Sequence, residues 1–120
     1  MQDTQITDAR EREAIESVPT GLFIGGEWVT TAATLPVVDP STGTVLTEVA
    51  DATPQEASAA LDAAAEAQAS WAATAPRERS EILTRAFDLL MAERDRLALI
   101  MTLEMGKPLA EAKGEVAYAA

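Results

Sequence analysis

The stretch TPQEASAALDAAAEAQASW, residues 53–71, divides the chain into a strand-like part before it and a helical part after it. Its first four residues form a capping box, in which Thr53 caps the helix N-terminus, Pro54 takes the first helical position and Glu56 reaches back to the cap. The residues that follow at helical spacing are Leu61, Ala64, Gln68 and Trp71. The sequence therefore predicts that a helix begins here.

Three more helices are predicted towards the C-terminus. Ala75-Pro76 marks the start of the second helix. Its wide apolar stripe consists of Ile82, Leu83, Ala86, Phe87 and Leu90. Asp95 is predicted to cap a third helix, Gly106 to end it, and Pro108 to open a fourth. The apolar positions of the fourth helix are Leu109, Ala112, Val116 and Ala120. Because this pattern is still in phase at the last residue, we expect the chain to be truncated there.

Strand patterns occupy residues 22–49. The segments LFI (22–24) and WVT (28–30) flank Gly25-Gly26, which can supply the positive φ angles of a tight hairpin turn. A second pair of strands flanks DPSTG (39–43), a turn with Asp-Pro at its start and Gly at its end. Pro36 implies an edge position or a strand start. We expect an α+β arrangement, in which a small antiparallel sheet is followed by about four helices.

Residues 1–19 are polar and charged, with a weak helical pattern at Ile6, Ala9, Glu13 and Ile15. They are predicted to form a mobile or helical N-terminal arm. This segment is acidic and unlike a signal or transit peptide. No apolar run in the sequence approaches the roughly 20 residues that span a bilayer. We therefore expect a cytoplasmic protein with no membrane partner.

The composition limits the kinds of function that the chain can have. Its net charge is −11, and no Lys or Arg occurs from Gly21 to Pro76, which argues against nucleic acid or an anionic membrane as a partner. Hydrophobic residues make up 48% of the chain but aromatic residues only 4%. Much of the remainder is alanine, which contributes little burial energy per residue, so the predicted core is shallow.

Few residues are candidates for chemistry. In the stretch EMGKP (104–108), Glu104 could act as a base or Lys107 could contact an anion, but a helix end followed by a proline restart is the interpretation we favour. Arg77 and Arg79 oppose the dipole of the second helix, which favours an ion-pair or subunit-contact role over substrate binding.

Other features of the sequence are interpreted as structural. The glycines are too few and wrongly spaced for a phosphate-binding loop. Trp71 and Phe87 are predicted core residues. The chain contains no cysteine and no histidine, and no pair of carboxylates is singled out by spacing. We therefore predict no catalytic, cofactor-binding or metal-binding residue in this chain.

Four phrases in this order resemble the aldehyde dehydrogenase superfamily. They are LFIGGEWV (22–29), VDPSTGTVLTE (38–48), the segment from Trp71 to Arg79 that ends in PRER, and TLEMGKP (102–108). The wording of TLEMGKP and of AEAKGE (110–115) is similar to the succinate-semialdehyde branch. The resemblance covers about residues 15–120.

This resemblance implies an α/β parent fold with a Rossmann-like coenzyme domain, of which residues 20–120 would be the N-terminal part. Family members oxidise an aldehyde to an acid with NAD or NADP, using a cysteine nucleophile, a glutamate that activates water, and an asparagine that holds the oxyanion. The family pattern places all of these beyond Ala120. It also implies a homo-oligomer, and a location near the aldehyde entrance for the helix face from Lys113 to Ala120.

Three interpretations remain open at this stage. The first is the N-terminal part of an NAD(P)-dependent dehydrogenase for a short semialdehyde, with succinic semialdehyde as the expected substrate. Its alternative form is a sister aldehyde dehydrogenase that acts on another aldehyde. The second is a non-catalytic truncated product or interaction module. The third, a freestanding α+β binding domain, is disfavoured by the ordered family phrases. On the first, the helices bury their apolar stripes against polypeptide outside this chain, and the chain alone is inactive.

Overall fold

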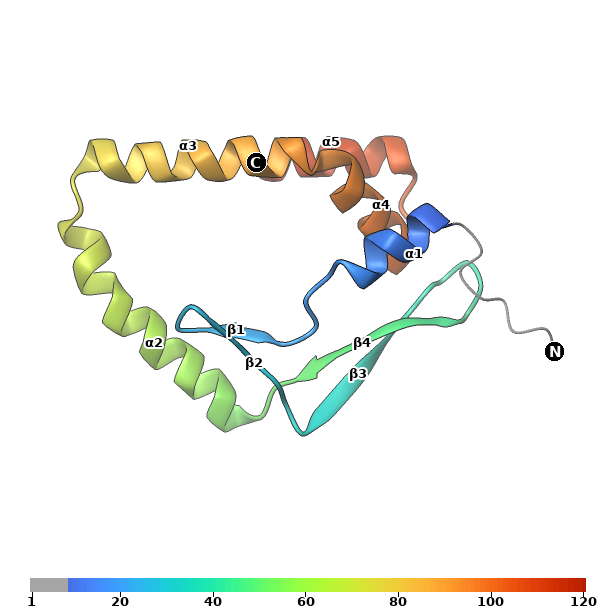
Figure 1. The fold of residues 1–120 in the computed structure, drawn as a ribbon, viewed down its shortest axis with the longest axis horizontal. Helices are drawn as coiled ribbons and strands as arrows, with labels where there is room; N and C mark the ends of the chain where they lie inside the picture. The colour runs from blue at the N-terminus through green and yellow to red at the C-terminus, as the bar shows by residue number, and fades with distance from the viewer. Residues whose placement is uncertain (1–8) are drawn as a thin grey trace.

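The computed structural model describes residues 9–120 (Figure 1). In chain order the elements are α1 (Ala9–Glu16), β1 (Leu22–Ile24), β2 (Glu27–Val29), β3 (Ala33–Val38), β4 (Val45–Asp51), α2 (Pro54–Ala73), α3 (Pro76–Ala92), α4 (Arg94–Met105) and α5 (Leu109–Ala119). Helix α1 falls within the predicted N-terminal arm, whose first eight residues, including Ile6, lie outside the described part. Helices α2 to α5 are the four helices that the sequence predicts.

The strands form two separate antiparallel hairpins. In the first, Ile24 pairs with Glu27 across the two-residue turn Gly25-Gly26, whose φ angles are 62° and 89°. Such positive angles strain any residue with a Cβ, so the glycines explain the tight turn. The Ala50 N–H donates to the Thr20 carbonyl at 2.8 Å and ties the lead-in of this hairpin to β4. The predicted antiparallel pairing is confirmed, but the strands do not join into one continuous sheet.

The second hairpin, β3–β4, turns at the predicted DPSTG segment. Asp39 organises this turn, because its Oδ1 accepts from the Ser41 N–H at 2.7 Å and its carbonyl accepts from the Gly43 N–H at 2.8 Å. Hydrogen bonds from the Ser41 hydroxyl and then from the Ser41 backbone lower the pKa of Asp39. Pro36 lies in β3, which has a single hydrogen-bonded neighbour, so its expected edge position is confirmed.

The predicted helix boundaries are confirmed for α2 and α3. The Glu56 N–H donates to Thr53 Oγ1 at 3.3 Å and the Thr53 N–H donates to Glu56 Oε2 at 2.7 Å, which completes the capping box. The hydrogen bonds from Thr53, the backbone bond first, lower the pKa of Glu56. Helix α3 begins at Pro76 as expected, with no side-chain cap at Ala75.

The start of α4 differs from the prediction, whereas its end agrees. Glu93 is the N-cap residue and Asp95 lies inside the first turn, so the prediction that Asp95 caps this helix is wrong. The reason is that Asp95 is bound to a partner on α5, described below, which local sequence does not reveal. The end of α4 is as predicted, since Gly106 has a φ of 76° and its N–H donates to the Thr102 carbonyl at 2.8 Å.

The described core consists of two small clusters in one corner of the fold. The first joins α1, β4 and α4 through Ile15, Leu46 and Leu103, with Val37 and Leu99 packed against it. The second joins α4 and α5 through Ala98, Ala112 and Val116. Among residues 9–120, every buried hydrophobic residue lies in α1, β4, α4 or α5. We call this set of helices and strands, together with β3, the packed corner.

Helices α2 and α3 contribute no buried residue. Trp71 is 38% exposed and Phe87 is 44% exposed, so the prediction that both are core residues fails for this chain. Their helical spacing correctly identified an apolar face, but this face stays largely exposed among the described residues. We refer to residues Pro54–Ala92, which include both helices, as the α2–α3 arm.

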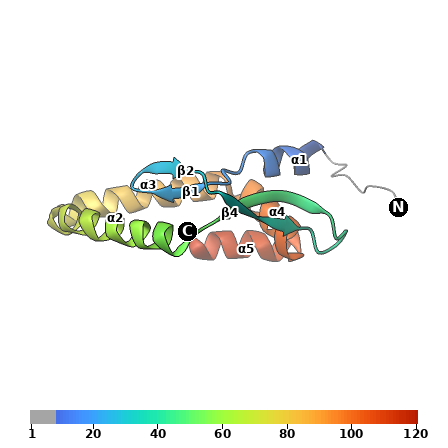
Figure 2. The ribbon, with the colours of Figure 1, turned by 90° about the horizontal axis from the view of Figure 1, so that it is seen from below.

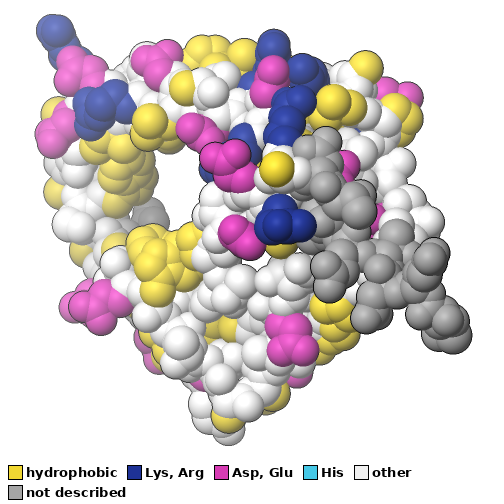
Figure 3. Space-filling view, turned by 45° about the vertical axis from the view of Figure 1, so that its right-hand side comes forward, with side chains coloured by type: hydrophobic (Ala, Val, Ile, Leu, Met, Phe, Trp, Pro, Cys, Tyr) yellow, Lys and Arg dark blue, Asp and Glu magenta, His cyan; other side chains and the backbone are white. Residues whose placement is uncertain are grey.

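The α2–α3 arm makes the molecule an open, flat frame. Figure 1 shows α2 running along the perimeter away from β4 and α3 returning along another side towards α4 and α5, and Figure 2 shows the frame as a thin layer. Its extents are 57 × 34 × 19 Å and its radius of gyration is 17.4 Å. A compact chain of this length has a radius of gyration of about 14 Å. The space-filling view is hollow in the middle of the frame (Figure 3). In the described residues, no helix is long and apolar enough to cross a membrane.

Candidate functional site

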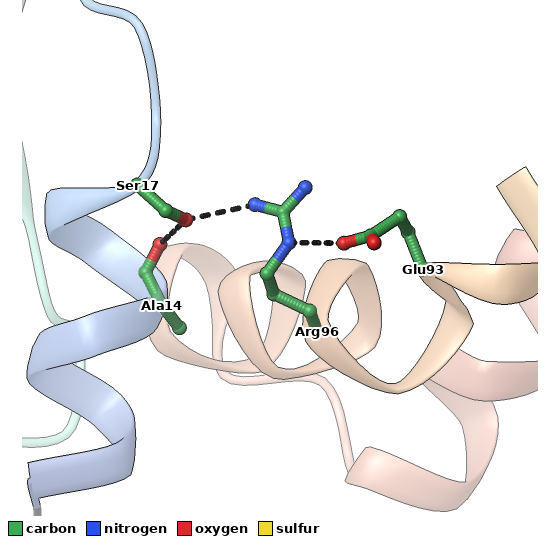
Figure 4. Close-up of polar contacts among 4 residues, drawn as sticks. All are labelled: Ala14, Ser17, Glu93 and Arg96. Atoms are coloured by element: carbon green, nitrogen blue, oxygen red, sulfur yellow. Dashed lines mark hydrogen bonds and ion pairs between the residues drawn. The ribbon is translucent and has the colours of Figure 1, made fainter. Parts of the chain in front are cut away.

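A polar contact between segments far apart in the sequence joins α4 to the residue that follows α1 (Figure 4). Arg96 Nη1 donates to Ser17 Oγ at 2.9 Å, and Arg96 Nε pairs with Glu93. Ser17 Oγ in turn donates to the Ala14 carbonyl at 2.7 Å, at the end of α1. Arg96, Ser17 and Ala14 line a cavity of about 300 Å³, together with Arg10, Glu13 and Leu99. Because each partner of Arg96 belongs to the chain, we interpret the contact as an anchor for α1.

Two ion pairs fix α5 in place. The Lys113 ammonium lies 3.1 Å from Asp95 Oδ1 and joins α5 to the first turn of α4. Its hydrogen bond is the largest cause of the lowered pKa of Asp95. Lys107, in the connection between the helices, pairs with Glu115 on α5. These contacts orient the α5 face from Lys113 onward, where Val116 is buried and Tyr118 is 92% exposed.

The EMGKP stretch forms the α4–α5 junction. Gly106 ends α4, Pro108 precedes α5, and Glu104 is exposed. The favoured interpretation of a helix end with a proline restart is therefore confirmed. Lys107 is bound to Glu115 rather than held open for an anion. The stretch therefore connects α4 to α5.

The arginines at the start of α3 lie away from the packed corner. Arg77 Nε contacts Glu81 Oε1 at 3.0 Å, one turn later on the same helix, which confirms the ion-pair interpretation. Arg79 is half-buried and lines a shallow hollow along α3 with Leu83 and Phe87. The hollow is lined by one positively charged side chain, Arg79, and by apolar side chains, which is typical of a surface that packs against other polypeptide.

The glycines are placed in turns rather than in a phosphate-binding loop. Gly25 and Gly26 lie in the β1–β2 turn, beside a groove whose other wall is the alanine-rich side of α2. Gly43 and Gly106 also have positive φ and occur in a hairpin turn and at a helix C-terminus. A dinucleotide phosphate site uses glycines at a helix N-terminus. Within residues 9–120 none of these glycines has that position, and no group of metal-ligating side chains gathers.

Ser17, Arg96 and the Asp95–Lys113 pair were not predicted from the sequence. Ser17 and Arg96 are 79 residues apart, so no local spacing could link them. The described geometry holds helices together, and it brings no nucleophile, base and oxyanion donor to one place. A second unforeseen feature is the Thr102 hydroxyl, which is buried and has no described hydrogen-bond partner.

Comparisons with known proteins show which family the chain resembles. Residues 28–120 match the model of the aldehyde dehydrogenase family. The chain is 64% identical over 76 residues to a succinate-semialdehyde dehydrogenase from Paenarthrobacter nicotinovorans, which covers 63% of the chain and 17% of that relative. It is 45% identical over 100 residues to a glutarate-semialdehyde dehydrogenase from Pseudomonas putida, which covers 82% of the chain and 21% of the relative.

A solved structure supports the same relationship. The fold matches a succinate-semialdehyde dehydrogenase from Burkholderia pseudomallei with a TM-score of 0.81 and 44% sequence identity, over 94% of this chain and 23% of that one. The chain thus spans about a fifth of the length of the proteins it matches. The expected resemblance is confirmed, as is the expected fold class, a part of the aldehyde dehydrogenase fold. The chain belongs to the aldehyde dehydrogenase family.

Proposed function

We propose that this chain is the N-terminal part of the coenzyme-binding domain of a dehydrogenase that oxidises succinic semialdehyde to its acid with NAD or NADP. The observation that carries the proposal is the 64% identity with a succinate-semialdehyde dehydrogenase. A separate observation, the TM-score of 0.81 with another enzyme of that name, supports it. In this proposal residues 20–120 form the domain part and residues 1–19 an N-terminal arm.

The chemistry of the proposed reaction depends on residues outside this chain. The reaction of the family begins with attack of a cysteine thiolate on the aldehyde carbonyl. The chain contains no cysteine, so it has no residue for that step. We therefore propose that the chain alone has no dehydrogenase activity, and that it contributes scaffold rather than catalytic residues.

The cofactor is assigned to the parent enzyme on the same reasoning. A nicotinamide dinucleotide needs backbone N–H groups at a helix N-terminus for its pyrophosphate. The described helices α2 and α3 both begin at proline, which lacks an N–H, and no glycine precedes them closely. The starts of these two helices do not fit the dinucleotide, and we propose that the parent enzyme binds it elsewhere.

A sister branch is the second candidate for the substrate. The 45% identity with a glutarate-semialdehyde dehydrogenase extends over 100 residues. It is close to the sequence identity with a succinate-semialdehyde dehydrogenase that matches a similar share of the chain. Glutaric semialdehyde has one more methylene than succinic semialdehyde. A methylene changes discrimination by roughly 1–3 kcal/mol, so the two substrates are separable by assay. We further propose a cytoplasmic homo-oligomer for the parent enzyme.

The test is to express the complete reading frame that contains this chain and, separately, the 120-residue chain. NAD(P)H formation is measured with both semialdehydes and both cofactors. We expect kcat/KM for succinic semialdehyde to exceed that for glutaric semialdehyde by roughly 10-fold or more, and no turnover by the chain alone. A preference for another aldehyde would overturn the substrate assignment. Turnover by the 120-residue chain would show that the catalytic residues were wrongly assigned to polypeptide outside this chain.

A further inference from the structure

We propose that the cavity between α1 and α4 is a binding site for a small oxyanion, a carboxylate or a phosphate, held by the guanidinium of Arg96. The inference goes beyond the proposed function, because this site needs neither the aldehyde nor the nicotinamide cofactor. We call it the α1–α4 cavity. Its lining residues are Arg10, Glu13, Ala14, Ser17, Arg96 and Leu99.

The α1–α4 cavity lies between one face of each helix. Its residues from α1 and from the turn after it, at positions 10, 13, 14 and 17, follow the helical spacing i, i+3, i+4 and i+7. Its two residues from α4 are three positions apart. Ala14 is buried and Leu99 packs against the first core cluster, so the floor is apolar and fixed. A volume of about 300 Å³ is at the lower end of the range for small-molecule sites, which suits a ligand of few heavy atoms.

Arg96 has hydrogen-bond donors that its contacts with the chain do not use. A guanidinium carries five N–H donors in one rigid plane. The described contacts use two of them, since Nη1 donates to Ser17 Oγ at 2.9 Å and Nε pairs with Glu93. Figure 4 shows the third nitrogen of the guanidinium without a contact to the residues drawn. The adjacent N–H groups of Nη1 and Nη2 match the spacing of two carboxylate or phosphate oxygens, so this edge is preorganised for an oxyanion.

The charges of the lining favour an anion over a cation. Arg10 on α1 adds a second positive charge, and Glu13 adds one negative charge. The whole chain has a net charge of −11, which repels anions at long range. Salt at physiological concentration screens that repulsion beyond about 8 Å, whereas a direct contact with Arg96 is screened much less. We therefore expect weak but selective binding, which Glu13 makes weaker still. A bound oxyanion would lie between a cation of α1 and a cation of α4.

The experiment is an NMR titration of the 120-residue chain at constant ionic strength, with succinate as the carboxylate probe and inorganic phosphate as the second probe. We expect saturable shifts at the Arg96 side chain and at amides within residues 10–17 and 96–99. The two probes should compete, and the one that binds more tightly identifies the preferred oxyanion. No saturable shift with either probe, binding without competition, or equal shifts at the exposed Arg77 would overturn the proposal.

Matched variants separate the oxyanion site from the α1 anchor. Arg96→Lys keeps the charge but removes the paired N–H groups, and should weaken binding about 10-fold or more. Ser17→Ala removes the acceptor of the anchor and should leave binding unchanged. Glu13→Gln removes the competing carboxylate and should tighten binding, and Arg77→Lys, outside the cavity, should have no effect. Equal binding by Arg96→Lys and the natural chain, or equal loss in Arg96→Lys and Ser17→Ala, would refute the site. Weaker binding by Glu13→Gln would refute the ligand class.

The protein from the complete reading frame provides the same test if the 120-residue chain does not fold. Because a ligand that binds only the folded state raises its stability, either probe should raise the Tm, and Arg96→Lys should reduce that rise. An equal rise in the natural protein and in Arg96→Lys would place the bound anion elsewhere and overturn the proposal. These measurements use no aldehyde, so an error in the proposed substrate leaves them unaltered.

Discussion

Asp95 on α4 and Lys113 on α5 lie 3.1 Å apart between carboxylate oxygen and ammonium nitrogen. This pair joins two helices whose facing residues, Ala98, Ala112 and Val116, make one of the two core clusters. Alanine contributes little burial energy, so a polar contact across this interface has a larger relative effect than it would beside a core of large side chains.

The pair predicts a stability that depends on pH. The pKa of Asp95 is lowered in the folded chain, so its stabilising contribution is fully present above the ordinary value of 3.8 and is lost as pH falls through the folded pKa. Asp95→Asn should lower the Tm of the packed corner at neutral pH, and the difference from the natural chain should shrink below pH 3.8. Thermal unfolding at several pH values tests this. A Tm difference that stays constant into strong acid would contradict it.

Gly106 predicts a second measurable effect. Its φ of 76° is strained for any residue with a Cβ, and an added Cβ would lie 3.3 Å from Pro40 Cγ. Gly106→Ala should therefore destabilise the packed corner by about 1 kcal/mol or more. Gly114→Ala is the matched control, since an added Cβ inside α5 meets no atom within 4 Å. That substitution should stabilise by roughly 0.5–1 kcal/mol. Urea unfolding of both variants gives the comparison, and the same sign for both would be inconsistent with this account.

The capping box predicts a local effect on α2. Thr53→Ala removes the acceptor of the Glu56 N–H and should destabilise the helix N-terminus by about 1 kcal/mol. Amide exchange in the first turn of α2 is the appropriate measurement, because the helix has no buried residue. Thr53→Ser keeps the hydroxyl and should restore most of the protection. If alanine and serine behave alike, the side-chain cap does not stabilise this helix.

The anchor between Arg96 and Ser17 predicts release of α1. Arg96→Leu removes the donor to Ser17 Oγ while leaving the apolar contacts of Ile15 in place. We expect faster proteolytic cleavage near Ser17 and a small loss of overall stability, within about 1 kcal/mol. Arg77→Leu, which removes an exposed pair within α3, is the control and should leave cleavage near Ser17 unchanged. Equal cleavage rates for the two variants would show that Arg96 does not hold α1.

Local patterns predicted the helices and turns because their causes are local. The Thr53 cap, the Gly25-Gly26 turn and the Gly106 helix end each depend on a few adjacent residues, and all three occur as expected. Asp95 was assigned as a cap from its position alone, whereas its carboxylate contacts the adjacent Arg94 and also Lys113, which is 18 residues away. When a side chain can bind either an adjacent partner or a distant one, the spacing of residues in the sequence does not show which of the two it binds.

The prediction that this chain carries no catalytic residue came from composition and resemblance, because the chain lacks cysteine, and it stays a prediction. The family of the chain followed from the four family phrases and is supported by the match over residues 28–120. The tertiary arrangement added the anchor at Arg96 and the contacts of Lys113, because both join segments far apart in the sequence.

The sequence by itself determined where the two hairpins turn, where α2 and α3 begin and where α4 ends, and which faces of the helices are apolar. Only the tertiary structure decided which of these faces are covered. The stripe on α5 is buried at Ala112 and Val116, whereas the equally regular stripe on α3 remains exposed at Leu83. Periodicity records that a face is apolar, but burial also requires a second surface, and the position of that surface depends on the path of the whole chain.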